Sequence, residues 1–427
     1  MPYDDPELPV VVVGAGIGGL VTALSLHGAG HVVHVYESVD EVRPLGVGLN
    51  LLPHAVRELD ALGLLPSLVA ASVQPTTLAY FTKRGEPIWH EARGRAAGYR
   101  WPQVSIHRGA LQQILLDAAL DRLGADHLHT NHHLVDLDSH NDGAVAHFAD
   151  RRGGSADRSV RASIVVGADG IHSVARALRY PHQGPPAWNG ALLWRGLATV
   201  PPVLDGRTMV WAGHPRQKFV GYPLADLPDG RQAFNFIAEL RTDDQVLVER
   251  EDWNRPGVLD EFIGPFEDWR FDWLDVPALI RAAPGTYRFP MVDREPVDRW
   301  SFGRTTLLGD AAHPMYPIGS NGASQAILDA AVLTGCLRDI ADPVAALERY
   351  DAERRPLTGA IVLANRGLGP ELPMQLVEER APDGFTDIAD VITPDEIASV
   401  TEGYRRTAGF ALAALADGAS LTDRDWS

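Results

Sequence analysis

The sequence contains very little cysteine and very little lysine. Its one cysteine, Cys336, excludes an intramolecular disulfide framework and a zinc site built from several cysteines, so we expect a reducing compartment, the cytoplasm. The lysines are Lys83 and Lys218, the formal net charge is −18, and no stretch is rich enough in Lys and Arg to follow a phosphate backbone. We therefore do not expect nucleic acid as a partner.

Uninterrupted hydrophobic runs are also missing. The most apolar stretch near the start, residues 8–26, follows acidic residues and contains four glycines, so we expect neither a signal peptide nor a membrane span. Hydrophobic residues make up 45% of the chain and charged residues 22%, which is typical of a globular protein. The 427 residues exceed what one core usually organises, which predicts two domains or one domain with a large insertion.

A strand, a glycine-rich turn and a helix are predicted at the start of the chain. Four valines, residues 10–13, precede glycines at positions 14, 16, 18 and 19, and helix-periodic residues continue to Leu26. A second predicted strand, residues 31–36, ends at Glu37, which lies 21 residues after Gly16. This order predicts a dinucleotide-binding βαβ unit.

Each part of this unit has a physical role. Gly14 permits the tight turn, Gly16 lets backbone amides approach a pyrophosphate, and Gly19 lets the helix pack closely on the strand. The helix N-terminus favours negative charge, and Glu37 can accept hydrogen bonds from ribose hydroxyls. The pattern predicts a site for an adenosine diphosphate group but does not separate NAD from FAD.

Two further segments place polar residues where they can reach such a cofactor. Residues 105–112 open a predicted helix that ends near Gly124, with Arg108 and Gln112 one turn apart on one face. An arginine at a helix start is, however, often simply solvated. A second predicted strand-turn-helix, residues 163–176, places Asp169 at the carboxyl end of its strand, where open α/β sheets bind ligands. By itself, its Asp-Gly pair is an ordinary turn signal.

A third segment combines an acidic turn with a helix start. Residues 305–314 form a predicted strand that ends at Asp310, and a long helix is expected to begin at Asn321 as its N-cap. Gly322 and Ala323 would then present free backbone N–H groups to a developing negative charge. The N1–C2=O edge of an anionic reduced flavin carries such a charge.

Taken together, these motifs resemble those of the para-hydroxybenzoate hydroxylase family, the single-component flavoprotein monooxygenases. The resemblance covers roughly residues 8–366 and includes the glycine motif, the DG motif at Asp169 and the GD motif at Asp310. Residues 43–50, the Arg294 region and residues 315–325 are most similar to the 5-methylphenazine-1-carboxylate 1-monooxygenases, with the salicylate-type hydroxylases as the wider neighbourhood.

The resemblance implies a set of cofactor contacts. It assigns Glu37 to the adenosine ribose, Arg108 and Gln112 to the pyrophosphate and ribityl region, and Asp310 to a ribityl hydroxyl. It also places the adenine near Leu134 and Pro317 beside the reactive edge of the flavin ring. The FAD contacts expected on this basis are Gly14, Ala15, Gly16, Ile17, Gly18, Gly19, Glu37, Ser38, Val47, Gly48, Arg108, Gln112, Leu134, Asp169, Asp310, Pro317, Gly322 and Ala323.

The resemblance also implies the reaction. NADH or NADPH reduces FAD, O2 then adds at the flavin C4a position, and the resulting hydroperoxide hydroxylates a small aromatic or polycyclic substrate of phenolic, phenazine-like or polyketide-like type. A second G-x-G-x-x-G motif for the nicotinamide is not visible, and we assign no catalytic base and no metal ligands. A Baeyer–Villiger or N-oxygenating enzyme on the same scaffold, and a non-catalytic nucleotide-binding escort protein, are the alternatives.

We predict an α/β protein with a Rossmann-like FAD-binding domain, an inserted mixed β-sheet domain that binds substrate, and a helical C-terminal segment. A predicted hairpin around residues 83–86 and alternating apolar runs within residues 192–239 support the inserted sheet. The expected boundaries are 1–75, 98–185 and 287–366 for the FAD-binding domain, 76–97 and 186–286 for the substrate domain, and 367–427 for the C-terminal segment. We expect a monomer or a homodimer.

Aromatic residues of the inserted sheet are the candidates to hold a planar substrate against the flavin. Such residues on a half-buried sheet are equally often plain core. Arg195 can pair with a substrate carboxylate or form a salt bridge between the domains. The expected pocket residues are Leu49, Trp194, Arg195, Tyr222, Phe236, Tyr316 and Pro317.

Overall fold

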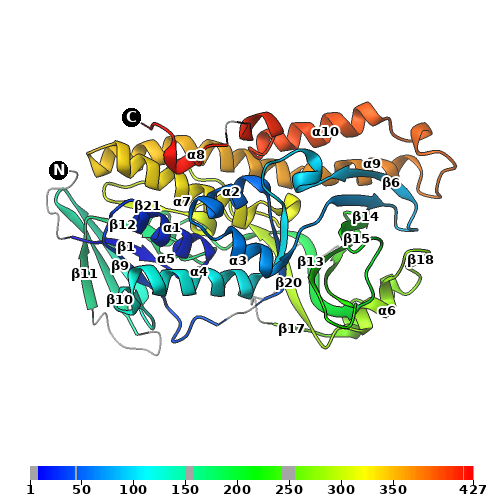
Figure 1. Ribbon diagram of the computed structural model, residues 1–427, viewed down its shortest axis with the longest axis horizontal. Coiled ribbons are helices and arrows are strands. Elements are labelled where there is room, and N and C mark those ends of the chain that lie inside the picture. The colour runs from blue at the N-terminus through cyan, green and yellow to red at the C-terminus, as the bar shows by residue number, and fades with distance from the viewer. Residues whose placement is uncertain (1–7, 44–45, 151–157, 243–254, 417, 427) are drawn as a thin grey trace.

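The computed structural model describes residues 8–43, 46–150, 158–242, 255–416 and 418–426. A parallel sheet lies at one end of the elongated molecule, a larger sheet lies at the other, and long helices run along one side of both (Figure 1). The fold is therefore α/β with a mixed second sheet and helices after residue 366, as the sequence predicts. The domain boundaries remain predictions.

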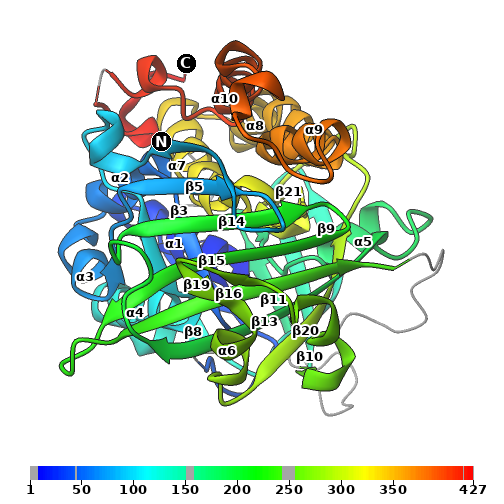
Figure 2. The same ribbon diagram turned by 90° about the vertical axis from the view of Figure 1, so that its right-hand side faces the viewer.

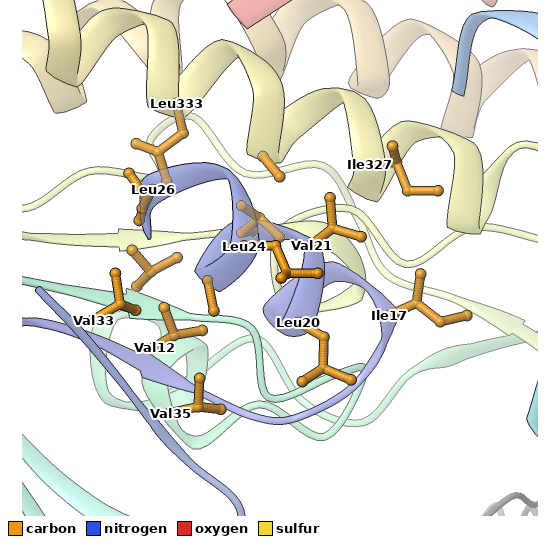
Figure 3. Packing of buried hydrophobic residues seen from close by; sticks show 14 of the residues in the cluster. Val12, Ile17, Leu20, Val21, Leu24, Leu26, Val33, Val35, Ile327 and Leu333 are labelled. Atoms are coloured by element: carbon orange, nitrogen blue, oxygen red, sulfur yellow. The ribbon is translucent and has the colours of Figure 1, made fainter. Parts of the chain in front are cut away.

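The parallel sheet contains the predicted βαβ unit. Its strands, in spatial order, are β21 (Thr305–Leu307), β12 (Ile164–Gly167), β1 (Val10–Val13), β2 (Val33–Tyr36) and β8 (Leu128–His129). Helix α1 (Ile17–Gly28) lies between this sheet and α7 (Gly322–Asp339), and Figure 3 shows Leu20 and Leu26 of α1 among valines of the sheet and Leu333 of α7. Because α1 contacts apolar neighbours on both sides, nine of its twelve residues are buried.

Smaller sheets and helices surround this core. A three-stranded antiparallel sheet consists of β9 (His133–His140), β10 (Gly143–Ala149) and β11 (Arg158–Ala162). A second consists of β3 (Gly48–Leu51), β7 (Val104–His107) and β4 (Ser72–Val73). The helices of this part are α2 (Pro53–Ala61), α3 (Leu65–Ala70), α4 (Arg108–Leu123), α5 (Val174–Arg179) and α8 (Pro343–Arg366).

The eight-stranded mixed sheet forms the other end of the molecule. Its order is β17 (Pro256–Gly257), β20 (Thr286–Asp293), β13 (Ala187–Val200), β16 (Gln232–Arg241), β15 (Gln217–Asp226), β14 (Thr208–His214), β5 (Thr77–Phe81) and β6 (Pro87–Ala92). Strands β18 (Arg270–Phe271) and β19 (Leu274–Asp275) and helix α6 (Val276–Arg281) lie beside it. The predicted hairpin is confirmed as β5–β6, and it pairs with β14 in parallel orientation.

The segment after residue 366 covers one edge of this sheet. It contains α9 (Leu372–Arg380) and α10 (Pro394–Thr407), both of which lie along the β14–β5–β6 side in Figure 2. Lys83 in the hairpin tip bonds to Glu378 of α9 at 2.5 Å. No helix among the described ranges combines the length and the apolar character needed to cross a membrane.

Stacked aromatic rings cover the β8 edge of the parallel sheet. The ring of Tyr36 stacks on His129 with centroids 4.5 Å apart, and His34 Nδ1 lies 2.9 Å from His129 Nε2. Burial, together with the nearby charges of His34 and Arg158, lowers the pKa of His129 to about 4. The folded protein therefore disfavours a charge on this ring.

We expect the stability to fall as the pH is lowered from about 6.5 to about 4. In this window the unfolded chain binds a proton at His129 and the folded chain does not, so acid favours unfolding. After allowance for solvent screening of this half-exposed ring, the loss is about 1 kcal/mol. Melting temperatures at pH 7.5, 6 and 5 measure it. The His129→Phe variant keeps a ring but cannot be protonated, and an unchanged pH slope in this variant would contradict the assignment.

Candidate functional site

The glycine-rich turn brings β1, α1 and the residue after β12 into close contact. Gly14 has φ +104°, and a Cβ there would lie 2.5 Å from the carbonyl oxygen of Ala168. A Cβ on Gly19 would lie 1.9 Å from the carbonyl oxygen of Gly14. At Gly16, by contrast, a Cβ would meet no atom within 4 Å, and no side chain caps α1. The turn therefore leaves an open cradle in front of a helix N-terminus, which suits a pyrophosphate.

Glu37 and Gln112 form hydrogen bonds with the backbone N–H and the backbone carbonyl of Ala15, respectively. Glu37 Oε2 accepts a hydrogen bond from the Ala15 N–H at 2.7 Å, and Gln112 Nε2 donates to the Ala15 carbonyl at 3.0 Å. The second oxygen of Glu37 accepts hydrogen bonds from the Ser38 hydroxyl and the Val39 N–H, both at 3.0 Å. Both predicted cofactor residues are thus next to the cradle, and their direct contacts with ribose and ribityl groups stay predictions.

Arg108 and Asp310 open on the same pocket. Arg108 is the first residue of α4, and Asp310 lies in the 3-10 turn Gly309–Ala311 that follows β21. Asp310 is accessible from the pocket but surrounded by protein on its other sides, and this desolvation raises its pKa, against the opposing effects of His313 and Arg108. A carboxylate in this position is a suitable acceptor for a ribityl hydroxyl.

Helix α7 begins where the sequence predicts, but its N-cap differs. The Asn321 side chain does not cap the helix. Its Nδ2 donates instead to the Gly319 carbonyl at 3.1 Å and to the Tyr404 hydroxyl at 2.8 Å, because the C-terminal helix α10 brings Tyr404 to this point. This corrects the predicted side-chain cap. Gly322 and Ala323 line the pocket, so the N-terminus of α7, which no side chain caps, faces into it and favours negative charge there.

The DG motif supports the GD loop. Asp169 accepts hydrogen bonds from the Ser173 hydroxyl at 2.5 Å and from the N–H groups of Val174 and Ala175 at 2.7 and 3.1 Å. Asp169 thereby holds the start of α5, and burial raises its pKa. Arg176 of α5 donates to the carbonyl oxygens of Ala311, Ala312 and Glu295. The neighbours of Asp169, Ala168 and Gly170, line the pocket, and a contact of Asp169 itself with FAD stays a prediction.

A buried ion network lies beneath the GD loop. Asp329 of α7 accepts hydrogen bonds from His313 at 2.5 Å, from Arg354 at 2.7 Å and from the Gly309 N–H at 3.1 Å. These three side chains are at most 5% exposed. The sequence indicated only that His313 belongs to the GD loop. Asp329 and Arg354 could not be found from the sequence, since each looks like an ordinary polar residue within a helix.

The remaining predicted cofactor residues lie around the same region. Val47 is buried, and its carbonyl accepts the Arg108 N–H at 2.9 Å. Leu134 is buried at the start of β9, close to the backbone of residues 129–132, which pairs with Glu37 and Val39. The adenine position near Leu134 stays a prediction.

The pocket continues from the cradle onto the eight-stranded sheet, with a volume of about 370 Å³. Alternate residues of the central strands face it, because successive side chains of a strand point to opposite faces. The sheet residues that line it are Leu193, Arg195, Met209, Trp211, Lys218, Val220, Tyr222, Ile237, Glu239, Phe289, Pro290, Met291 and Val292. Of the predicted pocket residues, Leu49, Arg195, Tyr222 and Pro317 line it.

Trp194 and Phe236 lie on the other face of the sheet, which corrects the prediction. Each neighbours a residue that faces the pocket, Arg195 and Ile237 respectively, so the alternation turns them away. Trp194 stacks on Phe262 at 5.0 Å and Phe236 is parallel to Phe219 at 6.3 Å. Tyr316 is 6% exposed and packs beside the pocket without lining it, unlike Met315 and Pro317.

Arg195 and Tyr222 share one acceptor on the opposite side of the pocket. Arg195 Nη2 donates to the Gly48 carbonyl at 2.6 Å, and the Tyr222 hydroxyl donates to the same oxygen at 2.8 Å. A Cβ on Gly48 would lie 2.7 Å from the Tyr222 ring, so glycine is required for this approach. Gly48 therefore connects β3 to the substrate sheet.

Three charged residues that the sequence did not indicate as a group also line the pocket. Lys218 Nζ lies 2.9 Å from Glu239 Oε2 and 2.6 Å from Glu371 Oε2, and all three side chains are at most 6% exposed. Lys218 and Glu239 are directly opposite each other on β15 and β16, so strand alternation could have suggested this pair. Glu371 comes from the 3-10 turn Gly369–Glu371 of the C-terminal segment, and nothing in the sequence connects it to the sheet.

Comparison with known proteins agrees with this geometry. A family model described as an FAD binding domain matches residues 7–254 and 276–364. The chain belongs to this FAD-binding family. It is 45% identical over 364 residues to a phenazine 1,6-dicarboxylic acid hydroxylase of Lysobacter antibioticus, covering 84% of this chain and 89% of that protein. It is 30% identical over 367 residues to a 3-hydroxybenzoate 6-hydroxylase of Klebsiella oxytoca, covering 84% and 87%.

Solved structures give the same fold. The FAD complex of a variant of HpxO from Klebsiella pneumoniae matches with a TM-score of 0.74 and 26% identity, covering 94% of this chain and 98% of that one. A salicylate hydroxylase substrate complex matches with the same TM-score at 23% identity, covering 96% and 97%. The enzyme is an FAD-dependent monooxygenase, and the resemblance seen in its motifs is confirmed.

Proposed function

We propose that this monooxygenase hydroxylates a planar aromatic carboxylic acid of up to three fused rings, with NADH or NADPH as the reductant. The observation that carries this proposal is the Arg195 guanidinium in the wall of the pocket. Among the described residues this guanidinium forms no ion pair with a carboxylate. It donates to the Gly48 carbonyl, its carbon lies 5.8 Å from the centre of the Phe289 ring, and its buried Nε has no hydrogen-bond partner. Such a charge is best compensated by an anionic group on the substrate.

The apolar part of the pocket supports a flat, extended substrate. Leu193, Val220 and Ile237 of the sheet line it together with Leu49 and Pro317. Trp211 and Phe289 add aromatic surface, which favours offset contact with a planar ring system. The relatives point the same way, because one is named for a phenazine dicarboxylic acid and another for hydroxybenzoate.

The residues of this chain hold and surround the cofactor. FAD, when bound, would supply the redox chemistry that connects oxidation of the nicotinamide to reduction of O2. The N-terminus of α1 would hold the pyrophosphate, and Asp310 would hold a ribityl hydroxyl. The N-terminus of α7 at Gly322 would stabilise negative charge on the flavin ring. The apolar wall excludes water from the reacting ring.

The test is substrate-stimulated oxidation of NADH and of NADPH by the FAD-loaded enzyme. Phenazine-1-carboxylate, salicylate and 3-hydroxybenzoate are compared with phenazine, which lacks the carboxylate. We expect the tricyclic acid to stimulate oxidation most and to gain one oxygen atom as a ring hydroxyl, identified by mass and NMR spectroscopy. Stimulation by phenazine but by none of the acids would refute the proposal, and a ring-expanded or N-oxide product would show the alternative chemistry.

Replacing Arg195 by methionine is expected to raise KM for the acid substrate by about tenfold to a hundredfold. The variant loses a charge-assisted hydrogen bond to the carboxylate but keeps an apolar side chain of similar length. Binding of phenazine should change less than about twofold, since it offers no anion to the guanidinium. Arg231→Met, in an exposed turn with Asp229, is the matched control and should leave KM unchanged. An equal loss of binding affinity for the acid and for phenazine would indicate that Arg195 has a packing role instead.

A further inference from the structure

The Lys218–Glu239–Glu371 cluster lies at the end of the pocket away from Arg195. Lys218, Glu239 and Leu193 are aligned on three adjacent strands, and Arg195 is two residues further along β13. The strand spacing and the rise per residue therefore separate the Lys218 and Arg195 backbones by about 12 Å. Between these two ends the wall is apolar, with Val220 and Ile237 facing the pocket. A substituted tricyclic aromatic molecule is long enough to reach both ends.

The charge of the cluster determines what it can bind. It contains one ammonium group and two carboxylates, so its formal charge is −1 when all three are ionised. Burial raises the pKa of Glu371, and Lys218 opposes this effect. A carboxylate placed here would meet a net negative group in a desolvated site, whereas a hydrogen-bond donor would find acceptor oxygens. The cluster therefore favours a donor.

Trp211 adds a second polar group to this part of the wall. It is 5% exposed, it lines the pocket, and its buried indole Nε1 has no hydrogen-bond partner. It lies on β14, opposite Val220 and two residues from Gly213, which pairs with Lys218. An unpartnered buried N–H is costly unless a ligand accepts from it. A hydroxyl group can satisfy both requirements, because it donates to a carboxylate and accepts from the indole.

We infer that the cluster of Lys218, Glu239 and Glu371, with Trp211, binds a hydroxyl group at the end of the substrate opposite its carboxylate. This inference rests on the proposed function, since it assumes the carboxylate at Arg195. The two ends together fix the long axis of the substrate over the flavin site. The cluster therefore determines which ring carbon is presented for hydroxylation.

The test measures the dissociation constants of the FAD-loaded enzyme for four ligands, by perturbation of the flavin spectrum. The four ligands have neither substituent, the carboxylate alone, the hydroxyl alone, or both. The ligands are phenazine, phenazine-1-carboxylate, 1-hydroxyphenazine and 6-hydroxyphenazine-1-carboxylate. We expect the 6-hydroxyl group to tighten binding of the acid by about tenfold or more, as for a hydrogen bond to a charged group. If the proposed function is wrong, the carboxylate will not increase the binding affinity. If this inference is wrong, the hydroxyl group will not increase the binding affinity.

Glu371→Gln keeps the shape of the side chain and removes its charge. We expect the variant to lose most of the hydroxyl preference, so that the dissociation constants of the two acids differ by no more than about threefold. Products from the hydroxylated acid should become a mixture of positional isomers. Glu378→Gln is the matched control, because Glu378 pairs with the other lysine, Lys83, outside this pocket.

Two results would overturn the inference. One is a hydroxyl preference that persists in both Glu371→Gln and Glu239→Gln. The other is tighter binding of phenazine-1,6-dicarboxylate than of the hydroxylated acid, which would make the distal end a second anion site. If Glu371→Gln does not fold, the triple variant with Lys218→Met, Glu239→Leu and Glu371→Leu removes all three charges together, and circular dichroism and FAD content verify its structure. Persistence of the preference in that variant would refute the inference equally.

Discussion

Gly16→Ala protein is expected to fold normally and to be purified without most of its FAD. Gly16 has extended backbone angles that any residue adopts, and a Cβ there would touch no protein atom within 4 Å. The methyl group would instead occupy the space in front of the α1 N-terminus, where the pyrophosphate must approach. Losing one or two charge-assisted hydrogen bonds should weaken FAD binding by about a hundredfold or more.

Gly19→Ala tests the same turn in the opposite way. Its Cβ would lie 1.9 Å from the Gly14 carbonyl oxygen, so α1 has to move away from β1. We expect a loss of about 3 kcal/mol or more in the free energy of unfolding. Urea unfolding of the apoproteins and the 450 nm absorbance of the holoproteins measure the two effects separately. Gly28→Ala, near the end of α1 and also without close neighbours, is the control for both.

If Gly16→Ala kept its FAD, the pyrophosphate would not lie at this turn. If it lost FAD and stability together, the alanine would have disturbed the fold, and the open cradle would be wrong. Only separation of the two properties, with Gly19→Ala unstable and Gly16→Ala stable, agrees with the structure.

Asp329→Ala is expected to reduce the free energy of unfolding by about 3 to 5 kcal/mol, because it leaves Arg354 and His313 buried without their shared carboxylate. Burial alone would raise the pKa of Asp329, but His313 and Arg354 lower it below its ordinary value. A carboxyl group with a lowered pKa contributes stability that is present above its unfolded pKa and is lost as the pH falls through the folded one. The contribution is therefore complete at neutral pH.

The same substitution should also weaken FAD binding. Asp329 holds the Gly309 N–H, and Gly309 precedes Asp310, so the GD loop loses its support. Thermal unfolding and FAD titration of the apoprotein measure the two losses. Asp142→Ala removes a carboxylate from an exposed pair with Arg161 and should change stability by less than about 0.5 kcal/mol. Comparable losses of stability in Asp329→Ala and Asp142→Ala would show that the buried network stabilises the protein no more than an exposed ion pair does.

The sequence predicted the glycine-rich turn and the helix starts of the cofactor half of the site, because local patterns define them. The turn at Gly14 to Gly19 and the start of α7 at Asn321 are set by glycines and polar residues within a few positions of each other. Their functions follow from backbone amides at helix ends, which need no partner from elsewhere in the chain. The side-chain cap at Asn321 was predicted wrongly, since Tyr404, which is distant in sequence, replaces it.

The substrate half was predicted only in part. Four of the seven expected pocket residues line the pocket, and Trp194 and Phe236 face the other side of the sheet. A shift of one residue along a strand exchanges its two faces, and aromatic residues are equally suited to either face here. Composition therefore could not decide which rings face the substrate, although the alternation within each strand was visible.

By itself, the sequence determined the FAD motifs, their order and the class of fold, because each depends on residues close together in the chain. Only the tertiary structure decided how these segments meet: Arg176 reaches the GD loop, Arg195 reaches Gly48, and Glu371 joins Lys218. The physical reason is that a buried charge needs partners on every side, and a folded chain supplies them from segments more than a hundred residues apart.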